Sequence, residues 1–166
     1  MKSLNIVMVI SASLISIGAA VSTRNTVELD TIDLEVKPLE SVYEAPVLTE
    51  ADLIEALINV ESRGNDSAIG DRHLVGNEAI GALQIRPIMV REVNRILKIK
   101  KSDTRFKMSD RWDREKTIEM FLVWKNYHHP NGDFEKIARN WNGGPKGFKK
   151  KRTEKYWIKV QQELDI

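Results

Sequence analysis

The sequence predicts a mainly helical domain with a small loop or hairpin region, preceded by an export segment and a disordered spacer. Three observations support this fold class. Apolar residues recur at helical spacing in five stretches after residue 49, glycine-rich pieces without a helical period occupy residues 65–85, and the first 22 residues are apolar. A chain of 166 residues, 42% hydrophobic and 30% charged, suits one domain of ordinary size plus additional sequence.

Residues 1–22 are interpreted as a signal peptide or a membrane anchor. Lys2 precedes 18 residues, 4–21, that carry no charge. The small residues around Ala20 and Ser22 favour cleavage by a signal peptidase after Ser22. The alternative is membrane anchoring through residues 4–21, because this run is long enough to span a bilayer. Both readings place the domain in the periplasm or the cell wall, secreted or anchored at its N-terminus.

Residues 23–48 are predicted to form an acidic, unstructured spacer. The segment carries seven acidic residues, counting Glu50, and only two basic ones. It shows no helical period and contains Pro38 and Pro46. From residue 51 onward the balance reverses, with 23 Lys and Arg against 17 Asp and Glu. The domain proper, residues 49–166, is therefore basic and biased towards polyanionic partners.

The chain contains no cysteine, which limits both its stability and its chemistry. Exported domains often rely on disulfides, so this one must be stabilised by its core. The absence also excludes thiol nucleophiles, disulfide exchange and thiolate metal sites. The adjacent His128 and His129 do not share a helix face and have no obvious third ligand, so we expect no metal site and no cofactor.

The first helix is predicted to begin after Thr49 and to end near Ser62. Thr49 with Asp52 three residues on is typical of an N-terminal cap, and Gly64 can adopt the left-handed conformation at the C-terminal end. The apolar stripe of this helix comprises Leu53, Ile54, Leu57 and Ile58.

Glu61 is the next position on that apolar stripe. Burial disfavours an ionised carboxylate, so a glutamate there needs a partner or a chemical task. An acid whose pKa is raised by burial can donate a proton near neutral pH. The alternative is a solvated carboxylate in the last turn of the helix.

Four further helices are predicted after the loop region 65–85. They begin at Pro87, near Ser109 or Asp110, at Phe134 and near Thr153. The third is expected to end near Tyr127, the fourth near Trp141 before a turn at 142–145, and the last at Leu164. Their predicted core residues are Val90, Val93, Ile96, Leu97, Ile118, Phe121 and Leu122, and three tryptophans at helical spacings, Trp112, Trp124 and Trp157, are also expected in the core.

Three short motifs occur in a fixed order along this helical pattern. They are Glu61-Ser62-Arg63-Gly64-Asn65 at a helix end, Gly81-Ala82-Leu83-Gln84-Ile85-Arg86-Pro87 after the loop, and Ala138-Arg139-Asn140-Trp141-Asn142-Gly143-Gly144-Pro145 after a late helix. Together, over residues 49–160, they resemble the lysozyme-like superfamily, and most closely the soluble lytic transglycosylase domain family, which cleaves peptidoglycan. The resemblance implies a mainly α, α+β lysozyme-like fold.

The resemblance also assigns roles to individual residues. It implies that Glu61 is the catalytic acid, that Ser62 helps to orient groups in the site, and that Gln84 and Asn142 lie in the substrate cleft. Trp141 stands where the family usually has tyrosine; an indole can stack on a sugar, but it has no hydroxyl for the catalytic carboxyl. Leu83 replaces the usual methionine, and residues 71–77 lengthen the intervening loop.

The product chemistry depends on whether a second carboxylate assists Glu61. The resemblance implies cleavage of the β-1,4 bond between N-acetylmuramic acid and N-acetylglucosamine, leaving 1,6-anhydromuramic ends. A hydrolytic muramidase, a true lysozyme, would position a second acid for water. Asp71 and Glu78 lie in the loop that could face Glu61, although turn polarity explains both residues as well.

Two other function classes remain open from the sequence. A non-catalytic module that binds cell-wall glycan could keep the fold, although Glu61, Gln84 and Asn142 are intact. A nucleic-acid binder lacks any matching motif, so we expect no nucleic acid partner. Residues 146–152, KGFKKKR, either bind an anionic polymer or form solvated surface. We expect a monomer acting on peptidoglycan glycan strands, in a bacterial, secretion-system, virion or phage-lysis context.

Overall fold

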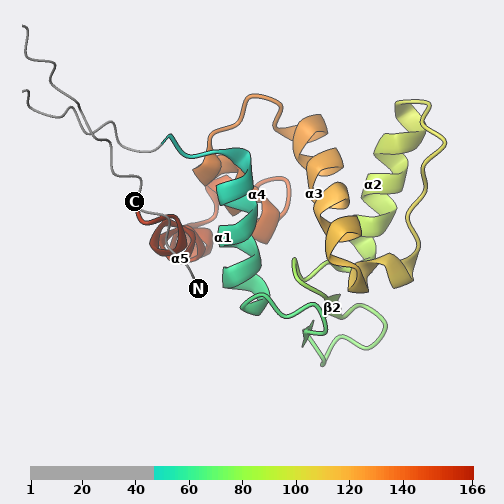
Figure 1. The fold of residues 1–166 in the computed structure, drawn as a ribbon, viewed down its shortest axis with the longest axis horizontal. Helices are drawn as coiled ribbons and strands as arrows, with labels where there is room; N and C mark the ends of the chain where they lie inside the picture. The colour runs from blue at the N-terminus through green and yellow to red at the C-terminus, as the bar shows by residue number, and fades with distance from the viewer. Residues whose placement is uncertain (1–46) are drawn as a thin grey trace, which may run out of the picture. The chain divides into compact units, whose positions relative to one another are not determined.

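The computed structural model describes residues 47–166, which form a mainly helical domain with one small hairpin (Figure 1). The predictions for residues 1–22 and for all but the end of the spacer 23–48 lie outside the described residues. The helices are α1 (Glu50–Ser62), α2 (Pro87–Ile99), α3 (Arg114–His128), α4 (Phe134–Gly143) and α5 (Glu154–Leu164); the strands are β1 (Ile69–Gly70) and β2 (Ala79–Ile80); the 3-10 turns are η1 (Met108–Trp112), η2 (Gly147–Lys149) and η3 (Lys151–Thr153).

Helix α1 is capped at its N-terminus as the sequence predicts. The Thr49 hydroxyl accepts a hydrogen bond from the backbone N–H of Asp52 at 3.3 Å, and the Asp52 carboxylate accepts one from the backbone N–H of Thr49 at 2.7 Å. The C-terminal end differs slightly, because Arg63 adopts the left-handed conformation with φ 54° before Gly64 does so with φ 76°. All four apolar residues of the expected stripe are buried.

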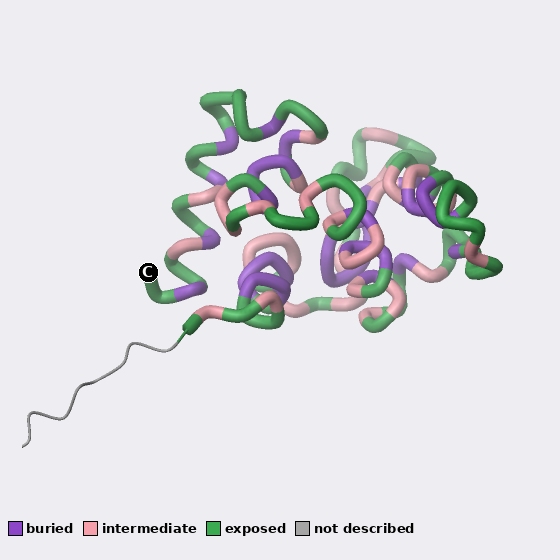
Figure 2. The backbone as a smooth tube through the Cα atoms, turned by 90° about the horizontal axis from the view of Figure 1, so that it is seen from above, coloured by how far each residue is buried: buried purple, intermediate pink, exposed green. Residues whose placement is uncertain are grey.

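The domain consists of two groups of helices that share one core. Helix α1 packs on α5, which also contacts α4, while α2 and α3 lie side by side (Figure 1). Buried and exposed residues alternate along α5, as expected for a helix with one face on a core (Figure 2). The largest fully buried side chains include Leu53, Leu57, Ile58, Leu83, Ile96, Met120, Phe121, Ile137 and Val160.

The loop region 65–85 contains the predicted hairpin. Strands β1 and β2 pair antiparallel, with Ile69 opposite Ile80 and Gly70 opposite Ala79. An additional bridge joins Ile80 to Ile85 and turns the chain back towards α2. The hairpin therefore places the second motif, which begins at Gly81, directly between the sheet and the start of α2.

The third helix begins later than predicted, at Arg114. The Asp113 carboxylate accepts a hydrogen bond from the backbone N–H of Lys116 at 3.1 Å, so the cap lies here and the preceding residues form η1. Trp124 and Phe121 are buried on α3, whereas Ile118 and Leu122 only pack against the edge of the core. The prediction that Trp112 belongs to the core is also wrong, because this residue lies in η1 and is 43% exposed.

Helix α4 extends two residues beyond the predicted end, to Gly143. The helix stops where Gly144 takes a φ of 79°, which a helix cannot accommodate. Asn142 consequently lies in the last turn of α4 and not in the turn after it. Among residues 47–166, no helix is long and apolar enough to cross a membrane, and no group of three potential metal-binding side chains is found.

Candidate active site

A cleft of about 570 Å³ lies where the end of α1, the hairpin, the start of α2 and the end of α4 meet. Five of the residues singled out from the sequence line it: Glu61, Asp71, Gln84, Trp141 and Asn142. These side chains come from four separate segments of the chain. The other lining residues are Gly70, Ala79, Ile85, Arg86, Ile88, Met89, Gly143, Gly144 and Arg152.

Glu61 is partly buried in the last turn of α1, at the end of the apolar stripe. Burial raises the pKa of its carboxyl group to about 7, because the ionised form loses hydration. The hydrogen bond from the Tyr156 hydroxyl stabilises the carboxylate and so lowers the pKa of Glu61. The negative charge of Asp71 raises this pKa. The positive charge of Lys159 lowers the pKa slightly. Glu61 can therefore hold or release a proton near neutral pH.

Tyr156, which sequence reasoning missed, completes the surroundings of Glu61. Its phenolic O–H donates a hydrogen bond of 2.8 Å to Glu61 Oε1 from α5, far along the chain. Burial, and then the nearby charge of Glu61, raise the pKa of Tyr156 well above its ordinary value, so the phenol remains a donor. Tyr156 thus provides a hydroxyl partner for the Glu61 carboxyl group. The sequence feature that could have pointed to Tyr156 is its spacing from Val160 and Leu164, which places all three on the buried face of α5.

Replacing Tyr156 with phenylalanine is expected to raise the pKa of Glu61 above about 7. The hydrogen bond favours the ionised carboxylate, so its loss leaves burial and the charge of Asp71 less opposed. A ¹³C NMR titration of the glutamate carboxyl groups would measure the change. Tyr127→Phe, at a tyrosine on α3, is the control and should leave Glu61 unchanged. An unchanged or lowered pKa in Tyr156→Phe would contradict this account of the site.

Trp141 forms one wall of the cleft and is held in place by the core behind it. Its ring packs edge-on against Phe121 and against Trp124, with centroids 5.1 Å apart in each pair. Such tilted arrangements are favourable for aromatic rings and fix the orientation of the indole. Trp141 therefore presents a rigid apolar surface to the cleft, next to the side chain of Asn142 at the end of α4.

Gln84 is positioned by an unusual backbone conformation. Its φ is 48°, and its side-chain N–H₂ group donates to the carbonyl oxygens of Gly81 at 2.9 Å and Ala68 at 3.3 Å. These bonds hold the amide over β1, where a Cβ atom on Gly70 would collide with Gln84 Oε1. The strand glycine therefore makes room for the glutamine that lines the cleft.

Asp71 lies across the loop from Glu61 and is exposed. Its carboxylate oxygen is 3.9 Å from Nε of Arg86, and both side chains are 43% exposed, so this ion pair contributes little stability. The backbone at Asp71 is left-handed, with φ 51°. Turn chemistry accounts for this conformation, since Asp tolerates it better than most residues. The negative charge of Asp71 nevertheless acts on Glu61 and raises the pKa of its carboxyl group.

Two residues considered from the sequence do not line the cleft. The Ser62 hydroxyl donates a hydrogen bond of 3.2 Å to the carbonyl oxygen of Ile58, one turn earlier in the helix. A serine within a helix commonly makes this bond to its own backbone. Glu78 accepts a hydrogen bond from the backbone N–H of Gly76 at 2.9 Å. Bonds from the backbone N–H groups of Glu78 itself and of Gly76 lower the pKa of Glu78, opposite to the need of an acid catalyst.

No family model matches the sequence, and no curated protein matches it either. A search of solved structures finds similarity to a chain from the crystal structure of Aeromonas hydrophila PliI in complex with Meretrix lusoria lysozyme. The identity is 20% and the TM-score 0.55, and the alignment covers 72% of this chain and 93% of the other. The two chains share a fold. At this level of identity, the similarity carries no information about function.

The geometry of the cleft defines what chemistry it can support. One carboxyl group with a pKa of about 7 faces an open cleft, beside a second carboxylate and an aromatic wall. Gln84 and Asn142 add amide groups that both donate and accept hydrogen bonds. This combination suits the binding of a polar, hydroxyl-rich chain and the transfer of a proton to one of its oxygens.

Proposed function

We propose that residues 49–166 form a peptidoglycan-cleaving enzyme related to the soluble lytic transglycosylase domains. It cuts the β-1,4 bond between N-acetylmuramic acid and N-acetylglucosamine and leaves 1,6-anhydromuramic ends. The observation that carries the proposal is Glu61, a carboxyl group with a pKa of about 7 that lines the same cleft as Gln84, Trp141 and Asn142. The order of the three sequence motifs supports the same assignment.

In this mechanism Glu61 acts first as an acid and then as a base. Its proton passes to the glycosidic oxygen as the bond from that oxygen to C1 of muramic acid breaks. The resulting carboxylate takes the proton of the 6-hydroxyl while that oxygen forms a bond to C1. Because Glu61 recovers its proton, no other acid is required. A pKa near 7 suits both steps, since neither protonation state is then costly to reach.

The neighbours of Glu61 have distinct parts in this scheme. Tyr156 holds one carboxylate oxygen, so the other oxygen is the one that exchanges the proton. Trp141 offers an apolar face on which a pyranose ring can pack. Gln84 and Asn142 hydrogen-bond to substrate hydroxyl or N-acetyl groups along the cleft. The positions of these side chains around the cleft support the roles, and none of the roles requires a metal or a cofactor.

Asp71 provides the specific observation that favours a second candidate, a hydrolytic muramidase. It lines the same cleft as Glu61 and acts on the pKa of Glu61 through its charge. A lysozyme uses a second carboxylate as a nucleophile or as a base for water. In that case Asp71 would be the second acid, and the products would carry reducing ends.

Mass spectrometry of the products formed from purified peptidoglycan tests the proposal. Anhydro-muropeptides would support a lytic transglycosylase, whereas muropeptides with reducing ends would support the muramidase and make Asp71→Asn the next variant. Binding to insoluble peptidoglycan without any soluble product would contradict both, and would leave a non-catalytic glycan-binding module. The same incubation in the presence of DNA examines the expectation that nucleic acid is not a partner.

The proposed substrate lies outside the cytoplasmic membrane, in agreement with the export segment predicted for residues 1–22. Secretion and N-terminal anchoring both bring the domain to the cell wall. We expect the proposed enzyme to work as a monomer. Sedimentation of the protein with and without soluble glycan strands would measure its oligomeric state.

A further inference from the structure

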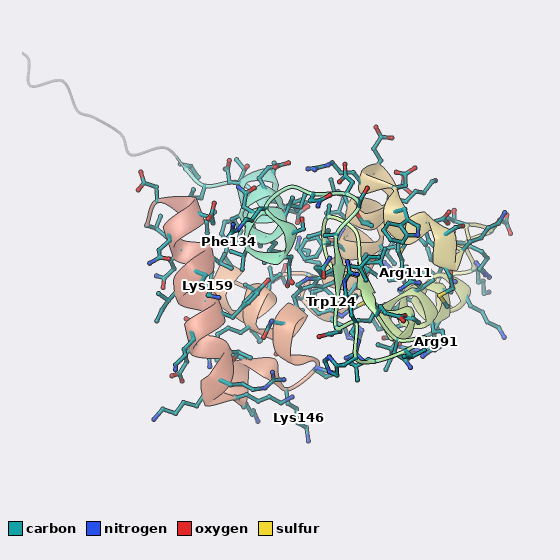
Figure 3. The ribbon with its side chains drawn as sticks, turned by 90° about the horizontal axis from the view of Figure 1, so that it is seen from below. Arg91, Arg111, Trp124, Phe134, Lys146 and Lys159 are labelled. Carbon is teal, nitrogen blue, oxygen red and sulfur yellow. The ribbon has the colours of Figure 1, made fainter. Side chains whose placement is uncertain are left out.

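Positive charge is concentrated on the side of the domain formed by α5 and the turns before it. Residues 146–159 include seven Lys and Arg and one acid, Glu154. Lys146 and Lys159 lie on this side, while Arg91 and Arg111 lie on the opposite side of the domain (Figure 3). Glu154 is 3.7 Å from the guanidinium of Arg139, so it already faces a cation, and the other acid of α5, Glu163, lies in the last turn of the helix.

The side chain of the buried Arg139, on α4, fixes the backbone of these basic turns through hydrogen bonds. Its guanidinium donates to the carbonyl oxygen of Phe148 at 2.7 Å and to the hydroxyl of Thr153 at 3.1 Å. It also pairs with Glu135 at 2.6 Å and lies 4.7 Å from the centre of the Phe148 ring. Because one buried cation fixes η2 and η3 to α4, the side chains of the turns project from a defined surface.

Arg152 is the residue of these turns that reaches the cleft. It lines the cleft beside Asn142, Gly143 and Gly144 and is exposed. Within residues 47–166, no hydrogen bond or ion pair engages its guanidinium group. Lys150 differs, because its ammonium group donates to the carbonyl oxygen of Gly143 at 2.6 Å.

The other arginine of the cleft, Arg86, is already engaged. Its Nε atom donates to the carbonyl oxygen of Asn77 at 3.1 Å and lies 3.9 Å from the carboxylate of Asp71. The cleft thus has one end where positive and negative charges compensate each other. At the other end, Arg152 presents a positive charge without a partner among the described residues.

We propose that Arg152 binds a carboxylate carried by the substrate, at the α4 end of the cleft. A guanidinium group matches a carboxylate with two parallel hydrogen bonds, and such bonds are stronger than those between neutral groups. This inference rests on the proposed function. On a peptidoglycan strand, carboxylates occur on the stem peptides and on the lactyl group of muramic acid where the peptide is absent. The enzyme therefore prefers acidic strands to neutral ones of the same linkage.

Selectivity between acidic and neutral strands tests this subsite. The substrates are peptide-bearing glycan strands, strands stripped of peptide, and each of these with its carboxylates converted to amides. The wild-type protein should cleave acidic strands with a kcat/KM roughly tenfold above that of their amidated counterparts, the effect of one charge-assisted contact. Arg152→Gln should reduce this ratio to about one, mainly through KM. Lys146→Gln, a matched loss of charge in the same turns but outside the cleft lining, should retain the ratio.

The substrates also distinguish the two sources of the carboxylate. If Arg152→Gln abolishes the preference for acidic over amidated strands only when the strands carry peptides, the bound carboxylate belongs to the stem peptide. If the variant abolishes the preference on stripped strands, the bound carboxylate belongs to the lactyl group. An unchanged ratio in Arg152→Gln, or an equal loss in Lys146→Gln, would overturn the inference.

A wild-type protein that cleaves no strand would overturn the proposed function instead. The same variants and strands would then be compared by calorimetric binding, where loss of the preference for acidic strands in Arg152→Gln alone would still support the subsite. Equal binding of acidic and amidated strands by the wild-type protein would reject it.

Discussion

Replacing Glu61 with glutamine is expected to lower the rate of glycan cleavage by about a thousandfold or more while leaving the fold intact. Glutamine has nearly the same shape as glutamate and can still accept the hydrogen bond from Tyr156 through its carbonyl oxygen. It cannot donate a proton to the glycosidic oxygen or take one from the 6-hydroxyl. The loss should therefore appear in kcat, with little change in KM.

The same substitution should stabilise the protein at alkaline pH. The pKa of Glu61 is about 7 in the folded protein and 4.5 for the ordinary glutamate, so the folded state binds the extra proton between these values. The free energy of unfolding contributed by this group therefore falls as the pH rises from about 4.5 to 7. Glu61→Gln removes that penalty and should raise the free energy of unfolding by roughly 3 kcal/mol above pH 7, and not below pH 4.

Denaturant unfolding at pH 4 and pH 8, together with the cleavage assay, would measure both effects. Glu55→Gln is the matched control, because Glu55 is exposed on the same helix and does not line the cleft. It should leave cleavage and stability unchanged. A Glu61→Gln variant that cleaves peptidoglycan at the wild-type rate would remove Glu61 from the mechanism. A variant without any gain in stability at pH 8 would contradict the raised pKa.

Replacing Gly81 with alanine is expected to destabilise the domain by about 3–5 kcal/mol. Gly81 has a φ of 78°, a conformation that L-residues adopt at a cost, and a Cβ atom there would overlap the backbone carbonyl oxygen of Arg111. The neighbouring backbone cannot move easily. The guanidinium of Arg111 donates to the carbonyl oxygens of Met108 at 2.9 Å and Glu78 at 3.0 Å and thereby ties η1 to the hairpin.

The control for this prediction is Gly76→Ala. Gly76 has a similar φ of 75°, but no atom lies within 4 Å of an added Cβ. This variant should therefore show only the conformational cost, about 1 kcal/mol. Thermal and urea unfolding of both variants would give the difference. Equal destabilisation of the two proteins would show that the contact between Gly81 and the Arg111 backbone is unimportant.

Much of the secondary structure could be predicted because its signals are local. The cap formed by Thr49 and Asp52, the proline that starts α2 and the apolar stripes lie within a few residues of the elements they specify. The misplaced start of α3 has the same origin. Ser109, Asp110 and Asp113 can all cap a helix; in the structure the Asp110 carboxylate accepts a hydrogen bond from the backbone N–H of Lys107 at the start of η1, and Asp113 caps α3.

The candidate site could be predicted in part. Glu61 was found because a carboxylate at the end of an apolar stripe contradicts the pattern around it, and Gln84, Trp141 and Asn142 because they belong to ordered motifs. Ser62 does not line the cleft, since its hydroxyl bonds back into its own helix. Tyr156 was missed because its position on α5 is that of any core residue, and its hydroxyl has no partner nearby in the sequence.

The sequence by itself therefore determined the helical class of this domain, the main helix boundaries and the acid at the end of α1. Only the tertiary structure decided what surrounds that acid. The bond from Tyr156, the proximity of Asp71 and the reach of Arg152 into the cleft join segments that are distant in the chain. Such contacts depend on how α1, α4 and α5 pack on one core, and the free energy of that packing comes from the whole buried surface, not from any local pattern.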